Sequence, residues 1–459
     1  MDSEFKPRPD QIEDLAKCIA NPRWMLLNDP GTGKTPTAAL YTWWNWTRNR
    51  GVTVWLQPLA IIKKNRDEIL RFTGFKPDDV RIVSGPPKQR KAAYAKKPKV
   101  LLMSADTFCR EWKLIDGVTL VIGDEWQLMF STNDSQRTTA LYQAMKHIPR
   151  LLPMTGTLIR GRLSSAFPAI HLIEPRYYGN YRQFLNFHTI TDFYGEIIDW
   201  INTEKITEIL RRHSCRRSFA SVHGEANLVI QTEYVQMATK QAEAYKEFHD
   251  KGVLELEKYI LDGTLPGVGL IRARQILSCP ELFDLGEAGR DANLEIHLRE
   301  HIDTGEPLMI ISASVPEQKR VLARCRALGL TAELMNGDTS QKRRGDLDEA
   351  FRGGAFQVMI ASEAVAIIGF NWGHLNHIVG LTLDYFDDNL IQGLFRAIRG
   401  KRETPLRGTL LSYEETVEDM VLAILERKMK LANRVDPTKP VYKLHQRRVR
   451  EELIPLGTV

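Results

Sequence analysis

The feature that most constrains the fold is a glycine-rich segment between an apolar stretch and a helical pattern. The segment Asn28–Thr35 reads NDPGTGKT, follows the apolar residues Trp24–Leu27 and leads into a helical run from Pro36 onward. In a strand–loop–helix context, backbone N–H groups and the N-terminus of the helix hold phosphate groups. The segment therefore predicts a parallel α/β fold with a nucleoside triphosphate bound at the loop.

The residues of this loop have separate expected roles. Gly31 and Gly33 let the backbone approach the anion, Lys34 neutralises the terminal phosphates, and the Thr35 hydroxyl ligates magnesium. Asn28 stands where the general phosphate-loop pattern has glycine. The predicted nucleotide-binding residues of the loop are Asp29, Pro30, Gly31, Thr32, Gly33, Lys34 and Thr35.

An acidic pair further along the chain complements the loop. The apolar residues Thr119–Ile122 read as a strand, and Asp124 and Glu125 follow at its carboxyl end. Asp124 is expected to hold the magnesium shell, and Glu125 to orient or deprotonate the attacking water. The predicted cofactors are therefore ATP and Mg²⁺, and the predicted catalytic residues of this half are Lys34, Asp124 and Glu125.

Short apolar strands alternate with helical patterns through the first part of the chain, which predicts a parallel sheet covered on both faces. Strands are expected at Trp24–Leu27, Val52–Gln57, Arg81–Ser84, Val100–Met103, Val118–Ile122 and Leu151–Met154. Helical signal dominates from Tyr177 to Leu282, with Leu228–Gln236 as the main strand, and alternation then resumes. The later strands are expected at Leu308–Ile311, Ala332–Leu334, Gln357–Ile360, His377–Leu381 and Thr409–Leu411.

The predicted fold class is thus α/β, with two parallel-sheet lobes and helical insertions between them. The first lobe is expected over residues 1–225, with a helical insertion after about residue 165. The second is expected over residues 226–459, with an N-terminal helical insertion to about residue 285 and a basic C-terminal tail. That tail, Lys439–Arg450, reads as a loose basic segment or as an arm for nucleic acid.

The second lobe carries an arginine pair that fits a nucleotide site. Arg396 and Arg399 lie three residues apart, and Gln392 lies one turn earlier, so a helix would place all three on one face. Two guanidinium groups in this arrangement can reach a γ-phosphate. The alternative is a solvated basic helix, continued by Lys401 and Arg402.

The motifs occur in the order typical of one group of proteins. They are Phe5–Gln11 (FKPRPDQ), Asp29–Thr35, Leu56–Leu59, Leu102–Phe108, Gly123–Gln127, Thr155–Thr157, Leu270–Pro280, Met335–Ser340, Ile360–Ser362 with Gly369–Asn371, and Glu415–Asp419. On these segments the chain resembles a superfamily-two helicase, and within that group the Swi/Snf-type double-stranded DNA translocases. The resemblance implies two RecA-like lobes and an ATP-driven DNA motor. It also places Gln11 against adenine and Gly369 in the loop that links DNA to the nucleotide cleft.

Some positions depart from the family pattern. Trp126 and Gln127 stand where the branch usually has alanine and histidine, Phe395 replaces a glycine, and Leu158 replaces a proline. The minimal build, with no obvious targeting domain, is similar to bacterial or bacteriophage members. This implies a cytoplasmic location, in a bacterial or phage-infected cell.

A motor that tracks a nucleic-acid backbone needs hydroxyl and cationic groups along its path. The candidates are Lys63, Lys64, Ser104, Thr107, Thr155, Arg160, Arg343 and Ser362. Other interpretations stay open: Lys63 and Lys64 can be an exposed helix start, and Ser104 a strand-end cap. The tryptophans Trp43, Trp44 and Trp46 are interpreted as packing residues.

Composition adds three expectations. The formal net charge of +6 is compatible with a polyanionic partner. The five cysteines are scattered and read as reduced thiols rather than as a disulfide frame or zinc site. No apolar run approaches the length that spans a membrane. DNA, double-stranded or forked, is the predicted partner.

Three functions compete at this point. The first is an ATP-driven double-stranded DNA translocase that remodels DNA or nucleoprotein structures. The second is a strand-separating DNA or RNA helicase, whose wedge hairpin could lie in Tyr177–Phe187. The third is an ATP-gated nucleic-acid clamp with little turnover. The acidic pair and the arginines argue against the third.

Overall fold

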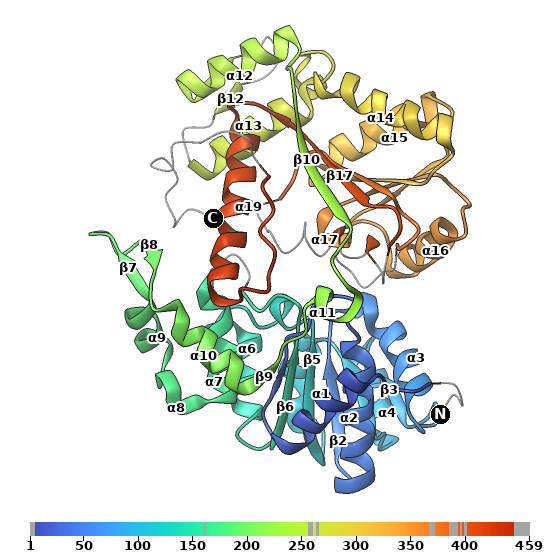
Figure 1. The fold of residues 1–459 in the computed structure, drawn as a ribbon, viewed down its shortest axis with the longest axis vertical. Coiled ribbons are helices and arrows are strands. Elements are labelled where there is room, and N and C mark those ends of the chain that lie inside the picture. Colours follow the sequence, from blue (N-terminus) through green and yellow to red (C-terminus); the bar gives the residue numbers. More distant parts are fainter. Residues whose placement is uncertain are drawn as a thin grey trace. The chain divides into compact units, whose positions relative to one another are not determined.

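The computed structural model describes residues 5–159, 162–255, 260–262, 266–366, 372–384, 393–394, 397–398 and 402–444. These residues form two compact units. Unit 1 comprises the chain up to Glu225 together with Leu431–Pro440, and unit 2 comprises Ala226–Lys430 with residues 441–444. Each unit is built on its own parallel sheet (Figure 1). The predicted fold class, two RecA-like α/β lobes, is confirmed.

Unit 1 contains a seven-stranded sheet in the order β3-β4-β2-β5-β6-β1-β9, in which all neighbours are parallel. Its strands are β1 (Met25–Leu26), β2 (Val52–Leu56), β3 (Val80–Ile82), β4 (Val100–Met103), β5 (Val118–Asp124), β6 (Arg150–Met154) and β9 (Ser214–Cys215). Its helices are α1 (Pro9–Ala20), α2 (Lys34–Asn49), α3 (Ile62–Phe72), α4 (Pro87–Ala95), α5 (Ala105–Glu111), α6 (Gln136–Ala144), α7 (Phe167–Ile173), α8 (Pro175–Tyr178), α9 (Tyr181–His188), α10 (Thr203–His213) and α11 (Phe219–His223).

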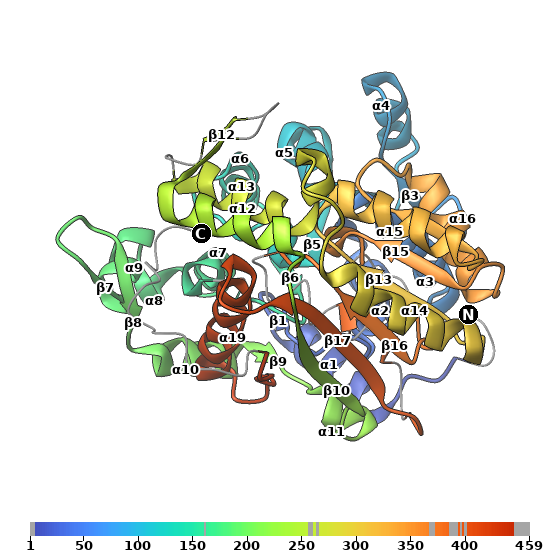
Figure 2. The same cartoon turned by 90° about the horizontal axis from the view of Figure 1, so that it is seen from above.

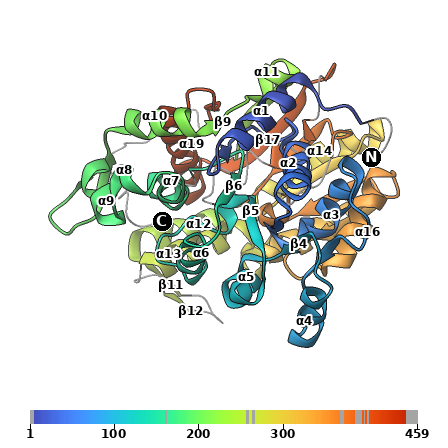
Figure 3. The same cartoon turned by 90° about the horizontal axis from the view of Figure 1, so that it is seen from below.

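Alternate residues of the central strands pack into two different cores. Leu120 and Ile122 of β5 join the core beneath α1, α2 and α3, whereas Val121 joins the core beneath α5, α6, α7 and α10. Figure 3 shows these two sets of helices on opposite sides of the sheet. Because both faces are covered, consecutive residues in the buried middle of the strand are apolar, which explains the continuous apolar runs of the sequence.

Unit 2 contains a six-stranded sheet in the order β10-β17-β16-β13-β15-β14, again parallel throughout. Its strands are β10 (Leu228–Val235), β13 (Leu308–Ile311), β14 (Ala332–Met335), β15 (Val358–Ala361), β16 (His377–Gly380) and β17 (Leu406–Tyr413). Its helices are α12 (Thr239–Lys251), α13 (Pro266–Ser278), α14 (Arg290–Thr304), α15 (Val315–Ala327), α16 (Gln341–Arg352), α17 (Glu363–Ala366) and α19 (Val417–Val435), the last of which ends in residues of unit 1.

Two antiparallel hairpins lie outside the main sheets. They pair β7 (Thr189–Thr191) with β8 (Ile197–Trp200), and β11 (Val253–Glu255) with β12 (Ile260–Asp262). The segment Tyr177–Phe187, named as a possible place for a wedge hairpin, is instead mostly helical, within α8 and α9. The β7–β8 hairpin follows directly, and Phe193 and Tyr194 at its tip are 97% and 86% exposed.

Candidate nucleotide site

The carboxyl ends of five adjacent strands of unit 1 bring the predicted nucleotide residues to one edge of the sheet. The phosphate loop follows β1, and Asp124 ends β5. Gln57, Ser104 and Thr155 directly follow β2, β4 and β6, respectively. In open parallel sheets this edge is where ligands bind. The sheet order β4-β2-β5-β6-β1 therefore assembles one site from segments far apart in the sequence.

The phosphate loop has the backbone shape that its glycines permit. Gly31 and Gly33 adopt φ angles of 80° and 92°, in the left-handed region that side chains disfavour. Gly33 directly precedes the first residue of α2, Lys34. A Cβ atom at Gly33 would also lie 2.4 Å from Nε2 of Gln11, so the Gln11 side chain packs closely on this glycine. The loop thus presents the N-terminus of a long helix, the feature that holds phosphate.

Asn28 replaces the usual glycine because its side chain ties the loop to two other segments. The residue is buried, and its Nδ2 atom donates to the Asp14 carboxylate of α1 at 2.7 Å. Its Oδ1 atom accepts from the backbone N–H of Arg217 at 3.0 Å. The departure from the family pattern is therefore a structural substitution that fixes the base of the loop.

Asp29 is also held by residues from beyond the loop. Its Oδ2 atom accepts from the backbone N–H of Phe219 at 2.8 Å, and its Oδ1 atom pairs with the ammonium group of Lys439. Lys439 belongs to the expected basic tail, but in the structure its side chain is mostly buried. The first residue of that segment is therefore a fixed part of unit 1 rather than a loose tail.

Gln11 lies beside the loop, at the start of α1. Its Oε1 atom accepts from the backbone N–H of Arg8 at 2.9 Å, and its Nε2 atom donates to the Gly33 carbonyl at 3.3 Å. The Arg8 guanidinium donates to the carbonyl of Thr32. The segment that the sequence assigned to the base of the nucleotide thus contacts the phosphate loop itself.

Lys34 and Asp124 lie close enough to influence each other. The ammonium group of Lys34 donates to the carbonyls of Asn28 and Asp29, at 2.7 and 3.1 Å. Burial and the negative charge of Glu125 raise the pKa of Asp124 to about 6, and Lys34 opposes this shift. A magnesium–phosphate group requires a cation for the phosphates and a carboxylate for the metal. Lys34 and Asp124 provide these two groups at the same edge of the sheet.

Two residues that the sequence did not assign to this site orient Asp124. Asn65, in α3, donates through Nδ2 to Oδ2 of Asp124 at 2.7 Å, and the same Nδ2 group contacts the Gln57 side chain. Both Asn65 and Gln57 are buried. The signal available in the sequence was Gln57 at the end of β2, where a polar residue ends an apolar strand, whereas Asn65 carried no such signal.

The unusual pair after the acidic residues has a clear structural role. Gln127 is buried, and its Nε2 atom donates to Oε2 of Glu125 at 2.9 Å. Trp126 is fully buried against Phe130, with 4.6 Å between the ring centroids. Glu125 itself has a positive φ of 54°. The structure thus explains Gln127 as the residue that orients the Glu125 carboxylate.

The turn Thr155–Thr157, which follows β6, lies next to the phosphate loop. A Cβ atom at Gly156 would lie 2.8 Å from Cδ of Pro30, so this turn packs directly on the phosphate loop. Thr155 is fully buried, and its hydroxyl accepts from the backbone N–H of Thr157 at 2.9 Å. Its hydroxyl therefore shapes the turn and is not available to an external nucleic acid.

The other nucleic-acid candidates of unit 1 differ in exposure. Lys63 and Lys64 are exposed at the start of α3, and Lys64 lies 3.9 Å from Glu68. Ser104 caps α5 by accepting from the backbone N–H of Thr107 at 3.2 Å, and Thr107 is buried. Ser104, interpreted alternatively as a strand-end cap, thus follows β4 directly and caps the helix that comes next. The tryptophans Trp43, Trp44 and Trp46 pack against the core, as interpreted from the sequence.

Two of the predicted nucleic-acid residues lie in unit 2, one at the start of a helix and one at the end of a strand. Arg343 is exposed in the first turn of α16, 3.4 Å from Glu333, and Ser362 is partly exposed directly after β15. Five predicted site residues lie outside the described residues: Arg160, Gly369, Gln392, Arg396 and Arg399. Arg402, considered part of a solvated basic helix, instead donates to the carbonyls of Gly373, Leu375 and Ala397.

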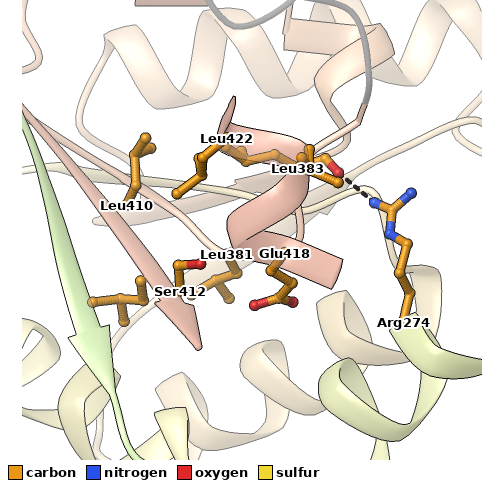
Figure 4. Close-up of a pocket in the computed structure, with 9 residues that line it drawn as sticks. Arg274, Leu381, Leu383, Leu410, Ser412, Glu418 and Leu422 are labelled. Atoms are coloured by element: carbon orange, nitrogen blue, oxygen red, sulfur yellow. Dashed lines mark hydrogen bonds between the residues drawn. The ribbon is translucent and has the colours of Figure 1, made fainter. Parts of the chain in front are cut away.

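A small pocket in unit 2 is not suited to a nucleotide. Figure 4 shows leucine side chains around it, with Glu418 and Ser412 on one side and Arg274 donating to the carbonyl of Leu383. The enclosed space is about 10 Å³, which holds no more than a water molecule. The pocket therefore belongs to the packing between β17, α13 and α19.

Two RecA-like lobes with a phosphate loop and an acidic pair at the sheet edge define the class as a superfamily-two helicase core. Residues 15–278 match the family model described as the SNF2-related domain, which is more than half of the chain. The chain belongs to this SNF2-related family.

Two solved structures are similar to the chain, and the second of them supports the fold. The Sulfolobus solfataricus SWI2/SNF2 ATPase core in complex with dsDNA is 18% identical, with 95% of this chain and 94% of that chain covered and a TM-score of 0.44. The Pyrococcus furiosus Hef helicase domain is 14% identical, with 90% and 97% covered and a TM-score of 0.54. No curated protein sequence matches the chain. Among the described helices, none has the length and apolar character needed to cross a bilayer.

Proposed function

We propose that the chain is an ATP-driven motor that tracks double-stranded DNA and remodels DNA or nucleoprotein structures. The observation that carries this proposal is the convergence of Lys34, Asp124 and Glu125 at the carboxyl edge of one parallel sheet, in a chain of the SNF2-related family. Such an edge serves phosphoryl chemistry, and the family couples it to DNA.

The residues present fit ATP with Mg²⁺. The helix N-terminus and Lys34 bind the phosphates, and Thr35 with Asp124 holds the metal, which neutralises developing charge when it is bound. Glu125, oriented by Gln127, holds the attacking water and takes its proton. Gln11, which donates to the Gly33 carbonyl of the loop, contacts the adenine in this proposal.

The second lobe supplies the remaining groups in this proposal. Arg396 and Arg399 stabilise the transition-state charge as arginine fingers, with Gln392 on the same helical face and Gly369 in the loop leading to DNA. An arginine finger contributes about 10³–10⁵ in rate. Lys63, Arg343 and Ser362 offer exposed groups to the DNA backbone, and Arg160 is a further candidate.

Strand separation is the second candidate function, and the β7–β8 hairpin is the observation that favours it. Phe193 and Tyr194 are exposed at a hairpin tip, where aromatic rings could enter between bases. Three carboxylates in the same hairpin, Asp192, Glu196 and Asp199, would repel a phosphate backbone. Because the three carboxylates oppose contact between the hairpin and a phosphate backbone, duplex tracking remains the first proposal.

ATP turnover without nucleic acid, and then with blunt duplex DNA, single-stranded DNA, forked DNA and RNA, tests the proposal. Strong stimulation by blunt duplex supports the translocase, and a further rise on the fork supports fork remodelling. Stimulation by single strands or RNA alone would favour the helicase. Absence of turnover on every substrate would leave the ATP-gated clamp.

Two variants make the test specific. Glu125→Gln should bind ATP and DNA but turn over at least about 100-fold more slowly, because the water loses its base. The double change Phe193→Ser and Tyr194→Ser should leave duplex-stimulated ATP turnover unchanged. A fork-unwinding assay then tests the same variant for strand separation. If the same double change abolishes strand separation, the hairpin is a wedge and the second candidate is correct.

A further inference from the structure

Unit 2 contains a cluster of three histidines at the amino-terminal end of β16. His297 and His301 lie one turn apart on α14, and His377 is the first residue of β16 (Figure 2). All three imidazoles are nearly or fully buried. Glu300, on the same helix, and Arg407, on β17, border the cluster. One ligand atom each from His297, Glu300 and His377 lies within 4.8 Å of the others.

Hydrogen bonds to acceptors determine which nitrogen of two rings carries the proton. Nδ1 of His301 lies 2.9 Å from the Glu306 carbonyl, and Nε2 of His297 lies 3.0 Å from the Glu233 carboxylate. Since a carbonyl and an ionised carboxylate only accept, both of these ring nitrogens donate. The lone pairs are therefore on Nε2 of His301 and on Nδ1 of His297.

The Nδ1 atom of His297 is buried and has no hydrogen-bond partner. It lies 4.0 Å from a carboxylate oxygen of Glu300. An orphaned, buried imidazole lone pair is costly unless something binds it. The carboxylate that fixes its other nitrogen is the partner that metal-binding histidines commonly have. Asn293 in turn donates to Glu233 at 3.0 Å and holds that carboxylate in place.

The contacts of His377 conflict with one another. Its Nδ1 atom lies 3.0 Å from the unprotonated Nε2 of His301 and also 3.0 Å from an Arg407 nitrogen, which can only donate. Nδ1 can donate to His301 or accept from Arg407, but it cannot do both. Its Nε2 atom is held by the Thr409 hydroxyl at 3.0 Å. A cation between the two facing nitrogens would satisfy both lone pairs at once.

We propose that His297, His301, His377 and Glu300 form a binding site for a divalent transition-metal ion of the zinc type. Three imidazoles and one carboxylate are a donor set that zinc accepts. Tetrahedral zinc places two imidazole nitrogens about 3.3 Å apart, close to the separation of His301 and His377. The ligand atoms of His297, Glu300 and His377 lie within 4.8 Å of one another, and that of His301 lies farther than this from at least one of them. These side chains must therefore close by at least about 1.5 Å to bind the ion.

Arg407 competes with the metal ion for this site. Its guanidinium group donates to Glu300 at 2.6 Å and lies against His377, so it occupies the position that the metal takes. The Arg407 side chain is 37% exposed and can turn toward solvent. The bound ion connects α14 to the amino-terminal end of the interior strand β16, without any part in ATP chemistry.

The experiment uses the full-length protein, stripped with a chelator and titrated with Co²⁺ and then Zn²⁺. Visible absorption of bound Co²⁺ reports the coordination, and elemental analysis gives the stoichiometry. One ion per chain is expected, with a rise in the melting temperature of the protein. His297→Ala and Glu300→Gln should weaken binding at least about tenfold. Arg407→Gln should tighten binding by about tenfold, because a competing cation is removed.

His249→Ala is the matched control, since His249 is an exposed histidine of the same unit, and it should bind as the parent protein does. Glu300 and Arg407 are both more than a third exposed, so their variants should fold even if a buried histidine variant does not. Absence of saturable binding would overturn the proposal. So would binding that the three cluster variants leave unchanged, which would indicate an adventitious ion only.

Discussion

Asp124 lies at the buried end of β5 beside a second carboxylate. Burial and Glu125 both raise its pKa, whereas Asn65 and Lys34 favour the charged form that binds metal. The charge state at this position is thus set by neighbours from three different segments. The sequence motif identifies the carboxylate, whereas Asn65 and Lys34 favour the charged form that binds metal.

Asn65→Ala should raise the activation constant of ATP turnover for Mg²⁺ by about 10–100-fold. This range is typical of losing a residue that orients a metal ligand. The reason is that the carboxylate of Asp124 loses the donor that orients it at 2.7 Å. Turnover measured against Mg²⁺ concentration gives the activation constant. Asn49→Ala, on the exposed end of α2, is the control. An unchanged activation constant in Asn65→Ala would show that Asp124 needs no such support.

Asn28→Gly restores the residue that the general phosphate-loop pattern has, yet it should destabilise unit 1. The change leaves the Asp14 carboxylate and the Arg217 N–H without their buried partner. A loss of about 1–3 kcal/mol in the free energy of unfolding is expected. Chemical denaturation measures it, with Asn21→Gly at the exposed end of α1 as control. Equal stability of Asn28→Gly and the parent would contradict this account.

At the scale of elements, strands within a continuous apolar run were predictable and strands without one were not. Each apolar run of the central strands corresponds to a strand, because burial on both faces demands it. Strand β9 has two residues, and the β7–β8 hairpin alternates only weakly, so periodicity had little to detect. The phosphate loop and the acidic pair were predictable because glycine, lysine and carboxylate types carry the chemistry. Asn65 was not, since an asparagine inside a helix has no such pattern.

The segment Leu431–Pro440 is an element whose role only the structure shows. Lys439→Ala should cost unit 1 about 1–3 kcal/mol in the free energy of unfolding, because Asp29 loses a largely buried cation. ATP affinity should fall with it, since Asp29 belongs to the phosphate loop. Lys443→Ala, at an exposed position of the same segment's continuation, should have no effect. Equal ATP affinity in both variants would exclude a supporting role for Lys439.

For the whole molecule, buried histidines predict a loss of stability in mild acid. Burial lowers the pKa of His171 and His188 in unit 1 and of His374 in unit 2. In the unfolded chain these groups titrate near their ordinary pKa of about 6.5. Protonation therefore favours unfolding, and the stability they contribute is complete above that pH and declines below it.

Urea unfolding at pH 7.5 and pH 5.5 measures this effect. Each of these histidines should contribute a loss of at most about 1 kcal/mol in the free energy of unfolding across the interval. His188→Gln should reduce the pH dependence of unit 1, whereas the exposed His249→Gln should not change that of unit 2. A stability that stays flat between the two pH values would refute the prediction.

The parallel pairing of β10 with β17 has a consequence for how the chain is made. All eight residues Leu228–Val235 pair with Leu406–Tyr413. The first strand of the second sheet therefore stays without its partner until the last strand has been synthesised. At a synthesis rate of about 5–20 residues per second, β10 leaves the ribosome roughly 10–40 s before its partner. The seven-stranded sheet of unit 1 ends earlier, at β9. During this interval the nascent protein carries the complete first sheet, whose unit still lacks Leu431–Pro440, together with an unpaired strand, which is the stage at which a chaperone would be of most use.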